Sequence, residues 1–468
     1  MRPAAAGNST LAVGPRKVSL SDIVAAMPAD LDHMDVARAS RIWRKGVIRS
    51  YIAGNTPPTP EVIAEGLLHN ETWGFYPDDN PRRSMYAGDT RAGLVPFLAH
   101  AHFGDSYKWL LYMDDDTVFF PGALLRLLPD FDPDIPYFLT DHLWYQEPGD
   151  KQPKHPHPLA PRCLPCHYQT KGRTRLPGAF PAPVGCPCRP QLLCRAAPHM
   201  FNEHCDIPRA PATTFSMHGG AGAVLSVGLL REVSLEFMEA CSLSLQSTGG
   251  DAFISICLWQ AGFHVTDPGP SIYTAGTFSF DPGPEDRLGA LRLLAAYIDG
   301  HRTGADRHWE TTCDRACEAK LEAMVSLHIR SRSFAGLDDA AAFIKAITVV
   351  YETYQEILAN KEARAHPAGR GGGERAAAST TAKQAAAVVQ AAAGGNKGTA
   401  AAVLKEESLR AAHARQGGRK EAATVKAVGE KKKKAVGTAV AGKAAVQATT
   451  ATAQTAATTA SKATAAAA

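Results

Sequence analysis

The chain has 468 residues, enough for two or three domains, and a formal net charge of +4 at pH 7. Residues 361–468 hold 18 Lys and Arg against 6 Asp and Glu, a net of +12, so residues 1–360 carry 32 − 40 = −8. Because the positive charge belongs to this tail, it does not indicate a nucleic-acid-binding fold. No apolar run of about 18 residues and no signal-peptide core is present, so no membrane-spanning or targeting segment is predicted.

Segments with helical spacing alternate with short apolar segments of strand length in the first part of the chain. In chain order they are a helix at 32–45, a strand at 47–52, a short helix near 61–68 within an irregular stretch at 55–88, a helix at 91–102, a strand at 109–113 with a further apolar segment at 117–120, a helix at 123–128 and a strand at 136–140. This alternation predicts an α/β fold with a largely parallel central sheet. Residues 1–30 are assigned to a poorly defined leader.

The most informative stretch is Trp109–Phe120, in which Asp114, Asp115 and Asp116 interrupt an apolar run. Three adjacent carboxylates repel one another, and hard oxygen ligands suit Mg²⁺ or Mn²⁺ with substrate phosphates completing the coordination. In open α/β sheets, the carboxyl end of a strand is where ligands bind. The alternative is a solvated acidic turn, which is disfavoured because surface acids seldom interrupt core strands.

A proline- and cysteine-rich insertion is predicted at 147–214, which holds 14 of the 32 prolines and 6 of the 10 cysteines. Such a segment cannot form regular helix or sheet, so covalent or metal crosslinks are needed to order it. Three disulfides are favoured, and the alternatives are a zinc site that uses Cys163, Cys166, Cys186 and Cys188 with nearby histidines, or free thiols. The spacing does not decide the pairing.

After the insertion the alternation resumes. The predicted elements are a strand at 213–218, a small-residue turn at 219–222, a helix at 229–245, a helix at 252–261, strands at 263–265 and 324–328, and an amphipathic helix at 337–358. Asp251 stands where the N-cap of its helix belongs. Cys241 and Cys257 flank this turn and can bridge it, and Cys313 and Cys317 are close enough for a local bridge. Glycosylation triplets begin at Asn8 and Asn70.

Four stretches together resemble a known family. In this order they are WLLYMDDDTVFF, MHGGAGAVLS, GGDAFISICL and VSLHI, and they resemble the fringe-like β-1,3-glycosyltransferases, the inverting group that includes Fringe and the mucin-type core galactosyltransferases. The resemblance covers residues 32–335 and implies a Rossmann-like GT-A fold for a domain at 31–360, followed by a disordered tail rich in Ala, Lys, Gly and Thr at 361–468.

The resemblance also implies an activity and a location. The expected enzyme moves a hexose or N-acetylhexosamine from a UDP-sugar to a hydroxyl of a glycan or glycoprotein, in β-1,3 linkage, with Mn²⁺ or Mg²⁺ as cofactor. Members of the family are usually held in the Golgi lumen by an N-terminal membrane anchor, which is not visible in this sequence. The alternative hypothesis is a fringe-like module that binds a glycan or a protein partner without catalysis.

The same resemblance implies which residues form the catalytic, metal and donor-binding sites. Asp251 resembles the catalytic base, which an inverting transfer needs on the face of the sugar opposite UDP. The metal is assigned to Asp114, Asp116 and His328, and donor binding to Asp114, Asp115, Asp116, Gly219, Gly220, Ala221 and Gly222. Two carboxylates that flank a glycosidic bond would instead indicate hydrolysis, which requires no metal.

Overall fold

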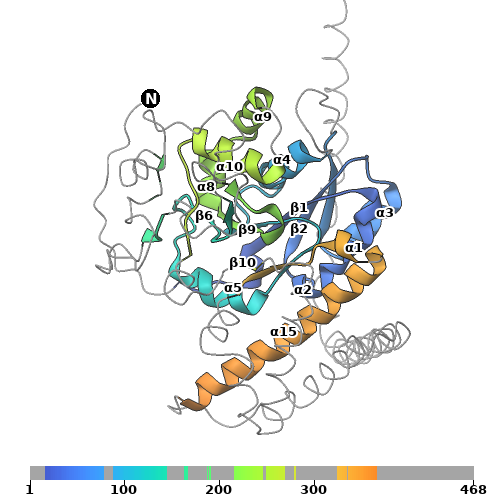
Figure 1. The fold of residues 1–468 in the computed structure, drawn as a ribbon, viewed down its shortest axis with the longest axis vertical. Helices are drawn as coiled ribbons and strands as arrows, with labels where there is room; N and C mark the ends of the chain where they lie inside the picture. Colours follow the sequence, from blue (N-terminus) through green and yellow to red (C-terminus); the bar gives the residue numbers. More distant parts are fainter. Residues whose placement is uncertain are drawn as a thin grey trace, which may run out of the picture. The chain divides into compact units, whose positions relative to one another are not determined.

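The structure is a computed structural model that describes residues 16–77, 88–144, 163–166, 187, 189–190, 216–245, 249–268, 279–280, 324–334 and 336–365. These residues contain a six-stranded sheet of order β3-β2-β1-β4-β9-β6 (Figure 1). Its strands are β1 (Ile23–Ala29), β2 (Arg49–Gly54), β3 (Glu71–Phe75), β4 (Trp109–Tyr112), β6 (Phe138–Leu139) and β9 (Ala223–Ser226). The first four in chain order pair in parallel, and only β9 is antiparallel to its neighbours. The predicted α/β fold with a mostly parallel central sheet is confirmed.

Two smaller sheets and a set of helices complete the described fold. The small sheets are β10 (Ser279–Phe280), β11 (Ser326–His328) and β5 (Thr117–Phe119), and the pair β7 (Leu143–Trp144) and β8 (Ser216–Met217). The α-helices are α1 (Met34–Ala39), α2 (Arg41–Arg44), α3 (Pro60–Leu68), α4 (Asp89–Phe103), α5 (Pro121–Leu127), α8 (Val227–Glu232), α9 (Leu235–Ser244), α10 (Gly250–Gln260) and α15 (Leu337–Ala365). Short 3-10 helices are η1 (Leu20–Asp22), η2 (Leu31–His33), η3 (Leu128–Asp130), η6 (Gly219–Ala221) and η7 (Ser331–Ser333).

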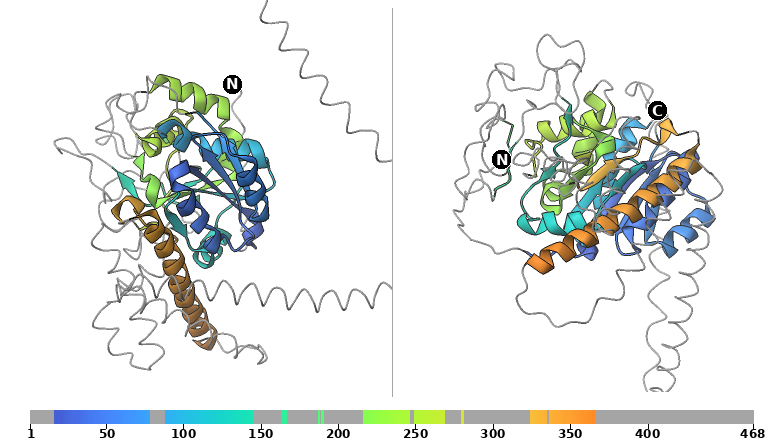
Figure 2. Two further views of the ribbon diagram at one scale, coloured as in Figure 1. Left: turned by 90° about the vertical axis from the view of Figure 1, so that its right-hand side faces the viewer. Right: turned by 60° about the horizontal axis from the view of Figure 1, so that its bottom comes forward.

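The central sheet is covered on both faces, which explains the unbroken apolar run of β4. Trp109 and Leu111 enter one core with α1, α5 and α15, whereas Leu110 and Tyr112 enter a second core with α4, α8, α9 and α10. Figure 2 shows α15 and the α9–α10 pair on different sides of the sheet. A strand buried on both faces has no polar position to alternate with, so it appears in the sequence as a continuous hydrophobic segment.

The first strand corrects the predicted leader at 1–30. Residues Ile23–Ala29, IVAAMPA, form β1 in the middle of the sheet, in parallel with both β2 and β4. Alanine has low strand propensity and Pro28 lacks an N–H donor, so the local signal for a strand was weak. Burial between two neighbouring strands decides the structure here, and all seven residues except Pro28 are buried.

Other boundaries also differ from the predictions. The stretch at 55–88 contains β3 as well as the predicted α3, and the helix predicted at 32–45 is divided at Ser40 into α1 and α2. The helix predicted at 229–245 is divided because the Ser234 hydroxyl accepts a hydrogen bond from Phe237 N and starts α9 anew. The strand predicted at 263–265 is wrong, since only isolated bridges of Thr266 are found there.

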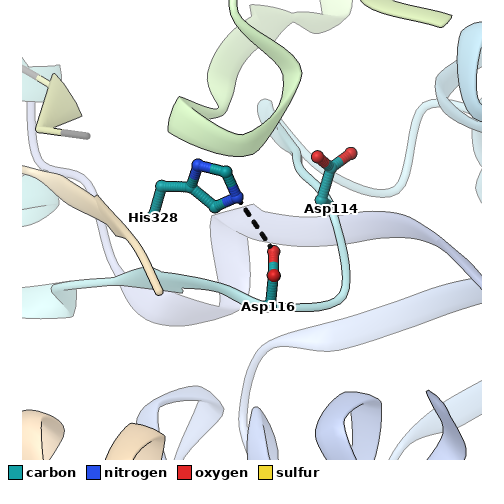
Figure 3. A group of neighbouring side chains, drawn as sticks. All are labelled: Asp114, Asp116 and His328. Atoms are coloured by element: carbon teal, nitrogen blue, oxygen red, sulfur yellow. Dashed lines mark ion pairs between the residues drawn. The ribbon is translucent and has the colours of Figure 1, made fainter. Parts of the chain in front are cut away.

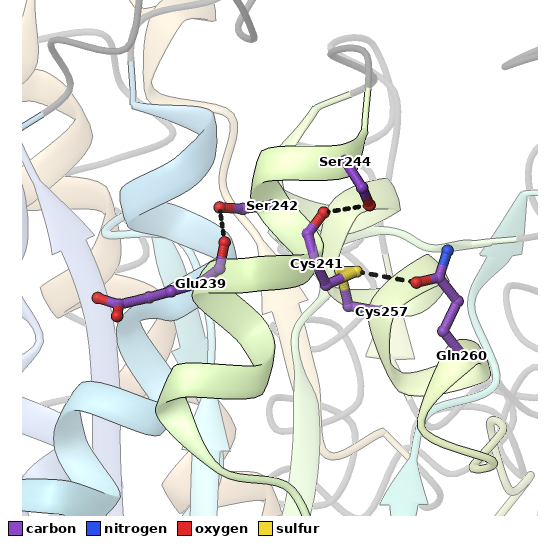
Figure 4. Close-up of a disulfide and its surroundings, with 6 residues drawn as sticks. All are labelled: Glu239, Cys241, Ser242, Ser244, Cys257 and Gln260. Atoms are coloured by element: carbon purple, nitrogen blue, oxygen red, sulfur yellow. Dashed lines mark hydrogen bonds between the residues drawn. A yellow bond between two sulfur atoms is a disulfide. The ribbon is translucent and has the colours of Figure 1, made fainter.

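The cysteine predictions are met in part. Cys241 and Cys257 form the predicted disulfide, and it joins α9 to α10 (Figure 4). Cys163 and Cys166 are also disulfide-bonded, which agrees with disulfides in the insertion. Most of 147–214, Cys313, Cys317 and residues 366–468 lie outside the described part of the chain. Among the described helices, none is both long and apolar enough to cross a membrane.

Candidate metal and catalytic site

A cleft of about 360 Å³ opens where β1 and β4 end. These strands are parallel neighbours, so the residues that follow their carboxyl ends, Asp30 and Asp114, reach the same edge of the sheet. The chain after β11 and the first turn of α10 close the other sides of the cleft, and His328 and Asp251 line it. The cleft is therefore at the position where open α/β sheets bind ligands.

Three of the predicted site residues meet in one cluster. One ligand atom from each of Asp114, Asp116 and His328 lies within 4.8 Å of the others (Figure 3). His328 comes from far along the chain, but β11 pairs antiparallel with β5 and sets His328 opposite Thr117. The register of that small sheet thus places the imidazole beside Asp116, with 3.3 Å between His328 Nε2 and Asp116 Oδ1.

The two carboxylates of the cluster differ in their surroundings. Burial disfavours the charged form of Asp116, but His328 and a 2.7 Å hydrogen bond from Ser331 N outweigh it, so the Asp116 pKa is held well below its usual value. Burial, followed by the negative charge of Asp116, raises the pKa of Asp114 to about 7. Within the described residues, no N–H or O–H group donates to the Asp114 carboxylate. The charge of His328 opposes this increase in pKa only in part, and a divalent cation would stabilise the charged form of Asp114 further.

The carboxylate of Asp115 is not part of this cluster. Its Oδ2 lies 3.0 Å from Nδ1 of His33, a residue of η2 just beyond β1. The hydrogen bond to Asp115 raises the pKa of His33 to about 9, whereas burial raises that of Asp115 to about 6. Asp115 still lines the cleft, as the predicted donor-binding role requires. Its carboxylate contacts His33 and does not belong to the cluster of Asp114, Asp116 and His328.

The small-residue turn at 219–222 contacts both Asp251 and the cluster of Asp114, Asp116 and His328. Gly220 lies against the imidazole of His328, where a Cβ would be 2.3 Å from the ring atom Cε1. Gly219 donates its N–H to Asp251 Oδ2 over 3.2 Å, and a Cβ on it would be 3.4 Å from Asp114 Oδ1. Gly222 has φ +78°, and a Cβ on it would meet the Phe119 ring at 2.9 Å, so glycine is required there for conformation and for space. The predicted close approach of this turn to the site is present.

Asp251 lines the same cleft as the cluster of Asp114, Asp116 and His328, but it does not cap its helix. Gly249 occupies the N-cap position of α10, with φ +95°, and Asp251 lies in the first turn. The carbonyl of Asp251 accepts a 2.8 Å hydrogen bond from the Ser255 hydroxyl, and the disulfide of Cys241 and Cys257 anchors α10 to α9. Burial raises the pKa of the Asp251 carboxyl above its ordinary value. The carboxylate is thus a stronger base than an exposed aspartate.

No family model and no curated protein matches this chain. The function must therefore be inferred from the side chains and their geometry.

The sequence did not predict several basic side chains that line the cleft. Arg330 and Arg332 follow His328 and line the cleft beside the cluster, and Arg330 adopts φ +56°, a left-handed conformation that is uncommon for arginine. Arg91, near the start of α4, is buried and forms an ion pair with Asp30 at another side of the cleft. The spacing of Arg330 and Arg332 after a predicted metal ligand was a usable signal, whereas only the fold brings Arg91 and His33 to the site.

Proposed function

We propose that this protein is a metal-dependent inverting glycosyltransferase of the fringe-like, GT-A type. It would transfer a hexose or N-acetylhexosamine from a UDP-sugar to a hydroxyl of a glycan or glycoprotein, in β-1,3 linkage. The observation that carries the proposal is the convergence of Asp114, Asp116, His328 and Asp251, from three separate segments, on one cleft at the carboxyl edge of a parallel sheet.

The possible ligand atoms of Asp114, Asp116 and His328 suit a divalent cation. Two carboxylates and one imidazole suit Mn²⁺ or Mg²⁺, which leave coordination positions open for phosphate oxygens. Asp114, with its raised pKa and its missing hydrogen-bond donor among the described residues, is the group that a cation would stabilise most. Held by Asp114, Asp116 and His328, such an ion would stabilise the negative charge that develops on the leaving diphosphate.

Two arginine side chains of the cleft support the proposal that it binds a nucleotide diphosphate. Arg330 and Arg332 lie on its wall next to His328. Guanidinium groups form paired hydrogen bonds with phosphate oxygens, so these two arginines are suited to hold the diphosphate of the donor. The Ser331 N–H between them is already used by Asp116, which fixes this segment relative to the metal ligands.

Asp251 is suited to remove the proton from the acceptor. The hydroxyl oxygen of the acceptor would attack the anomeric carbon as the bond from that carbon to the diphosphate breaks, and Asp251 would take the hydroxyl proton. Gly219 donates its backbone N–H to Asp251 Oδ2, and Ala252 donates its backbone N–H to Asp251 Oδ1. These two hydrogen bonds fix the orientation of the carboxylate. The disulfide between α9 and α10 supports action in an oxidising compartment, such as the Golgi lumen.

The test separates binding from chemistry. UDP binding is measured by calorimetry with and without millimolar Mn²⁺, and a panel of UDP-sugars is screened for Mn²⁺-dependent release of UDP. We expect Asp116→Ala to lose Mn²⁺-dependent UDP binding, because it removes a metal ligand. We expect Asp251→Asn to keep that binding while transfer falls by about 10²–10⁴-fold, the usual contribution of a general base.

Two outcomes would contradict the proposal. Wild-type rates of transfer in both variants would show that neither residue has its assigned role. A chain that does not bind UDP at millimolar Mn²⁺ would support the non-catalytic binding module.

A further inference from the structure

The turn between α3 and β3 exposes an asparagine whose side chain the proposed activity does not use. Asn70 is exposed and has φ +57°, and its carbonyl accepts a 2.9 Å hydrogen bond from Ser50 N at the start of β2. Its side-chain amide donates to Gly46 O over 2.8 Å. Asparagine is enriched in this left-handed conformation, so the turn alone explains the residue type, and a second observation is needed to assign a further role.

The second observation is the sequence that begins at Asn70. Asn70, Glu71 and Thr72 form the acceptor triplet for N-linked glycosylation. Glu71 is buried, with its carboxylate paired to Arg41 and Arg44, whereas the Thr72 hydroxyl hydrogen-bonds His102 at the exposed surface. Asn70 precedes β3 and is exposed, and its side-chain amide contacts Gly46 O rather than either of these arginines. A modification of Asn70 therefore leaves the buried ion pairs undisturbed.

The third observation is an apolar surface around Asn70, which we call the α3 patch. Leu67 and Leu68, directly before the turn, are 72% and 83% exposed, and Ile63, one helical turn earlier, is 45% exposed. Val47 is 44% exposed and follows Gly46, the residue that accepts the Asn70 hydrogen bond. Single exposed apolar side chains are normal, whereas several that lie close along the chain offer a surface that a neighbouring group can cover.

The redox state of the cysteines agrees with the same modification. The bridge between Cys241 and Cys257, and the disulfides of Cys163 and Cys166, need an oxidising compartment to form and persist. Asparagine glycosylation of secreted proteins takes place in such a compartment, and it adds a bulky, solubilising group at the surface.

We propose that Asn70 is N-glycosylated and that the glycan covers the α3 patch. In the reaction, Asn70 Nδ2 forms a bond to the anomeric carbon of an N-acetylglucosamine that a lipid diphosphate carries. The bond from that carbon to the diphosphate breaks, the lipid diphosphate leaves, and one Nδ2 proton passes to a base of the membrane-bound oligosaccharyltransferase. Because an amide nitrogen carries two hydrogens, one remains to donate to Gly46 O. This proposal does not depend on the proposed glycosyltransferase activity.

The experiment uses the full chain, preceded by a cleavable secretory signal and followed by a tag that carries a reporter glycosylation triplet. All variants contain Asn8→Gln, so that Asn70 and the reporter are the only acceptor triplets. Peptide-N-glycosidase treatment followed by mass spectrometry identifies each asparagine that carried a glycan. We expect the glycan on Asn70 in the parent and in Thr72→Ser, and its complete loss in Thr72→Val and Asn70→Gln.

The Thr72 variants are the matched pair, because they leave Asn70 and its left-handed turn unchanged. Chains whose reporter is glycosylated while Asn70 is not would overturn the proposal. Coverage of the patch is tested by sedimentation velocity before and after enzymatic removal of the glycan from the folded protein. We expect self-association to increase on removal, and not to increase when Leu67→Ser and Leu68→Ser are also present. Equal sedimentation of the two forms would overturn the covering role.

Discussion

The contact between Gly220 and His328 yields a quantitative prediction for the substitution Gly220→Ala. A Cβ at this position would lie 2.3 Å from the imidazole, whereas ordinary contact begins at 3.4 Å, so the ring must move by about 3.4 − 2.3 = 1.1 Å. Metal–ligand distances tolerate deviations of about 0.2 Å. The displaced ring would therefore leave the metal with only the two carboxylates.

We expect the Mn²⁺ affinity of Gly220→Ala to fall by about 10–100-fold, equivalent to about 1.4–2.8 kcal/mol, as when a supporting group of a metal ligand is lost. The assay is calorimetric titration of Mn²⁺ into the full chain, with thermal unfolding measured on the same samples to show that the variant is folded. The effect is steric, because the backbone of Gly220 does not have the positive φ that would strain alanine.

Gly219→Ala is the matched control one residue earlier. A Cβ there would lie 3.3 Å from Asp251 Cβ and 3.4 Å from Asp114 Oδ1, distances that shifts of a few tenths of an ångström relieve. We expect its Mn²⁺ affinity to change by no more than about threefold, since such shifts stay near the tolerance of the site. Wild-type affinity in a folded Gly220→Ala variant, or an equal loss in both variants, would refute the assignment of His328 as a metal ligand.

Three further predictions follow from the ionisable groups. Because the Asp114 pKa is about 7 and protons compete with metal, Mn²⁺ should bind about tenfold more weakly at pH 6 than at pH 8 in calorimetric titrations, and a flat profile would contradict this. Asp115→Asn should retain Mn²⁺ binding in the same assay while Asp116→Asn loses it, because the Asp115 carboxylate is held by His33; equal losses would contradict the geometry. Glu71→Gln should cost about 3–5 kcal/mol in chemical denaturation, because it leaves Arg44 buried without its counter-charge, whereas Glu65→Gln at the surface should cost at most about 1 kcal/mol. The Glu71 pKa is lowered in the fold, so this contribution is complete above the unfolded value of about 4.5 and is lost as pH falls through the folded value; a pH-independent difference between wild type and Glu71→Gln would refute it.

The acidic pair Asp114 and Asp116 was the most predictable part of the candidate site because its signal is local. Asp114 and Asp116 interrupt an apolar run, and β4 and β5 on either side of them are both buried. Charged residues at such a position are energetically unfavourable unless they have a partner, so the sequence itself indicated a cation. His328 and Asp251 required the resemblance of four separate stretches, since nothing in their immediate neighbourhood distinguishes them from structural residues.

The parts that the sequence did not predict depend on contacts between distant segments. Strand β3, ETWGF, contains Gly74 and the charged Glu71, and Glu71 is buried only because Arg41 and Arg44 reach it from α2. Three of the seven residues of strand β1 are alanine and one is proline, so its strand character comes from its two neighbours rather than from propensity. In the same way, His33 becomes a partner of Asp115 only because β1 lies next to β4.

One strand register determines the geometry of the cluster of Asp114, Asp116 and His328. The pairing of Thr117 with His328 joins positions 211 residues apart in the sequence (328 − 117), and the hydrogen bond from Ile329 N to Asp116 O, 3.0 Å long, extends the same contact. Successive side chains of a strand point to opposite faces, so a slip of one residue would turn the imidazole away from Asp116 and bring an apolar side chain to the cluster. A slip of β11 would also move Leu327 out of the apolar core that it shares with its ladder partner Val118, so this pair opposes the slip. The apolar residues of these two short strands therefore fix the geometry of the polar site.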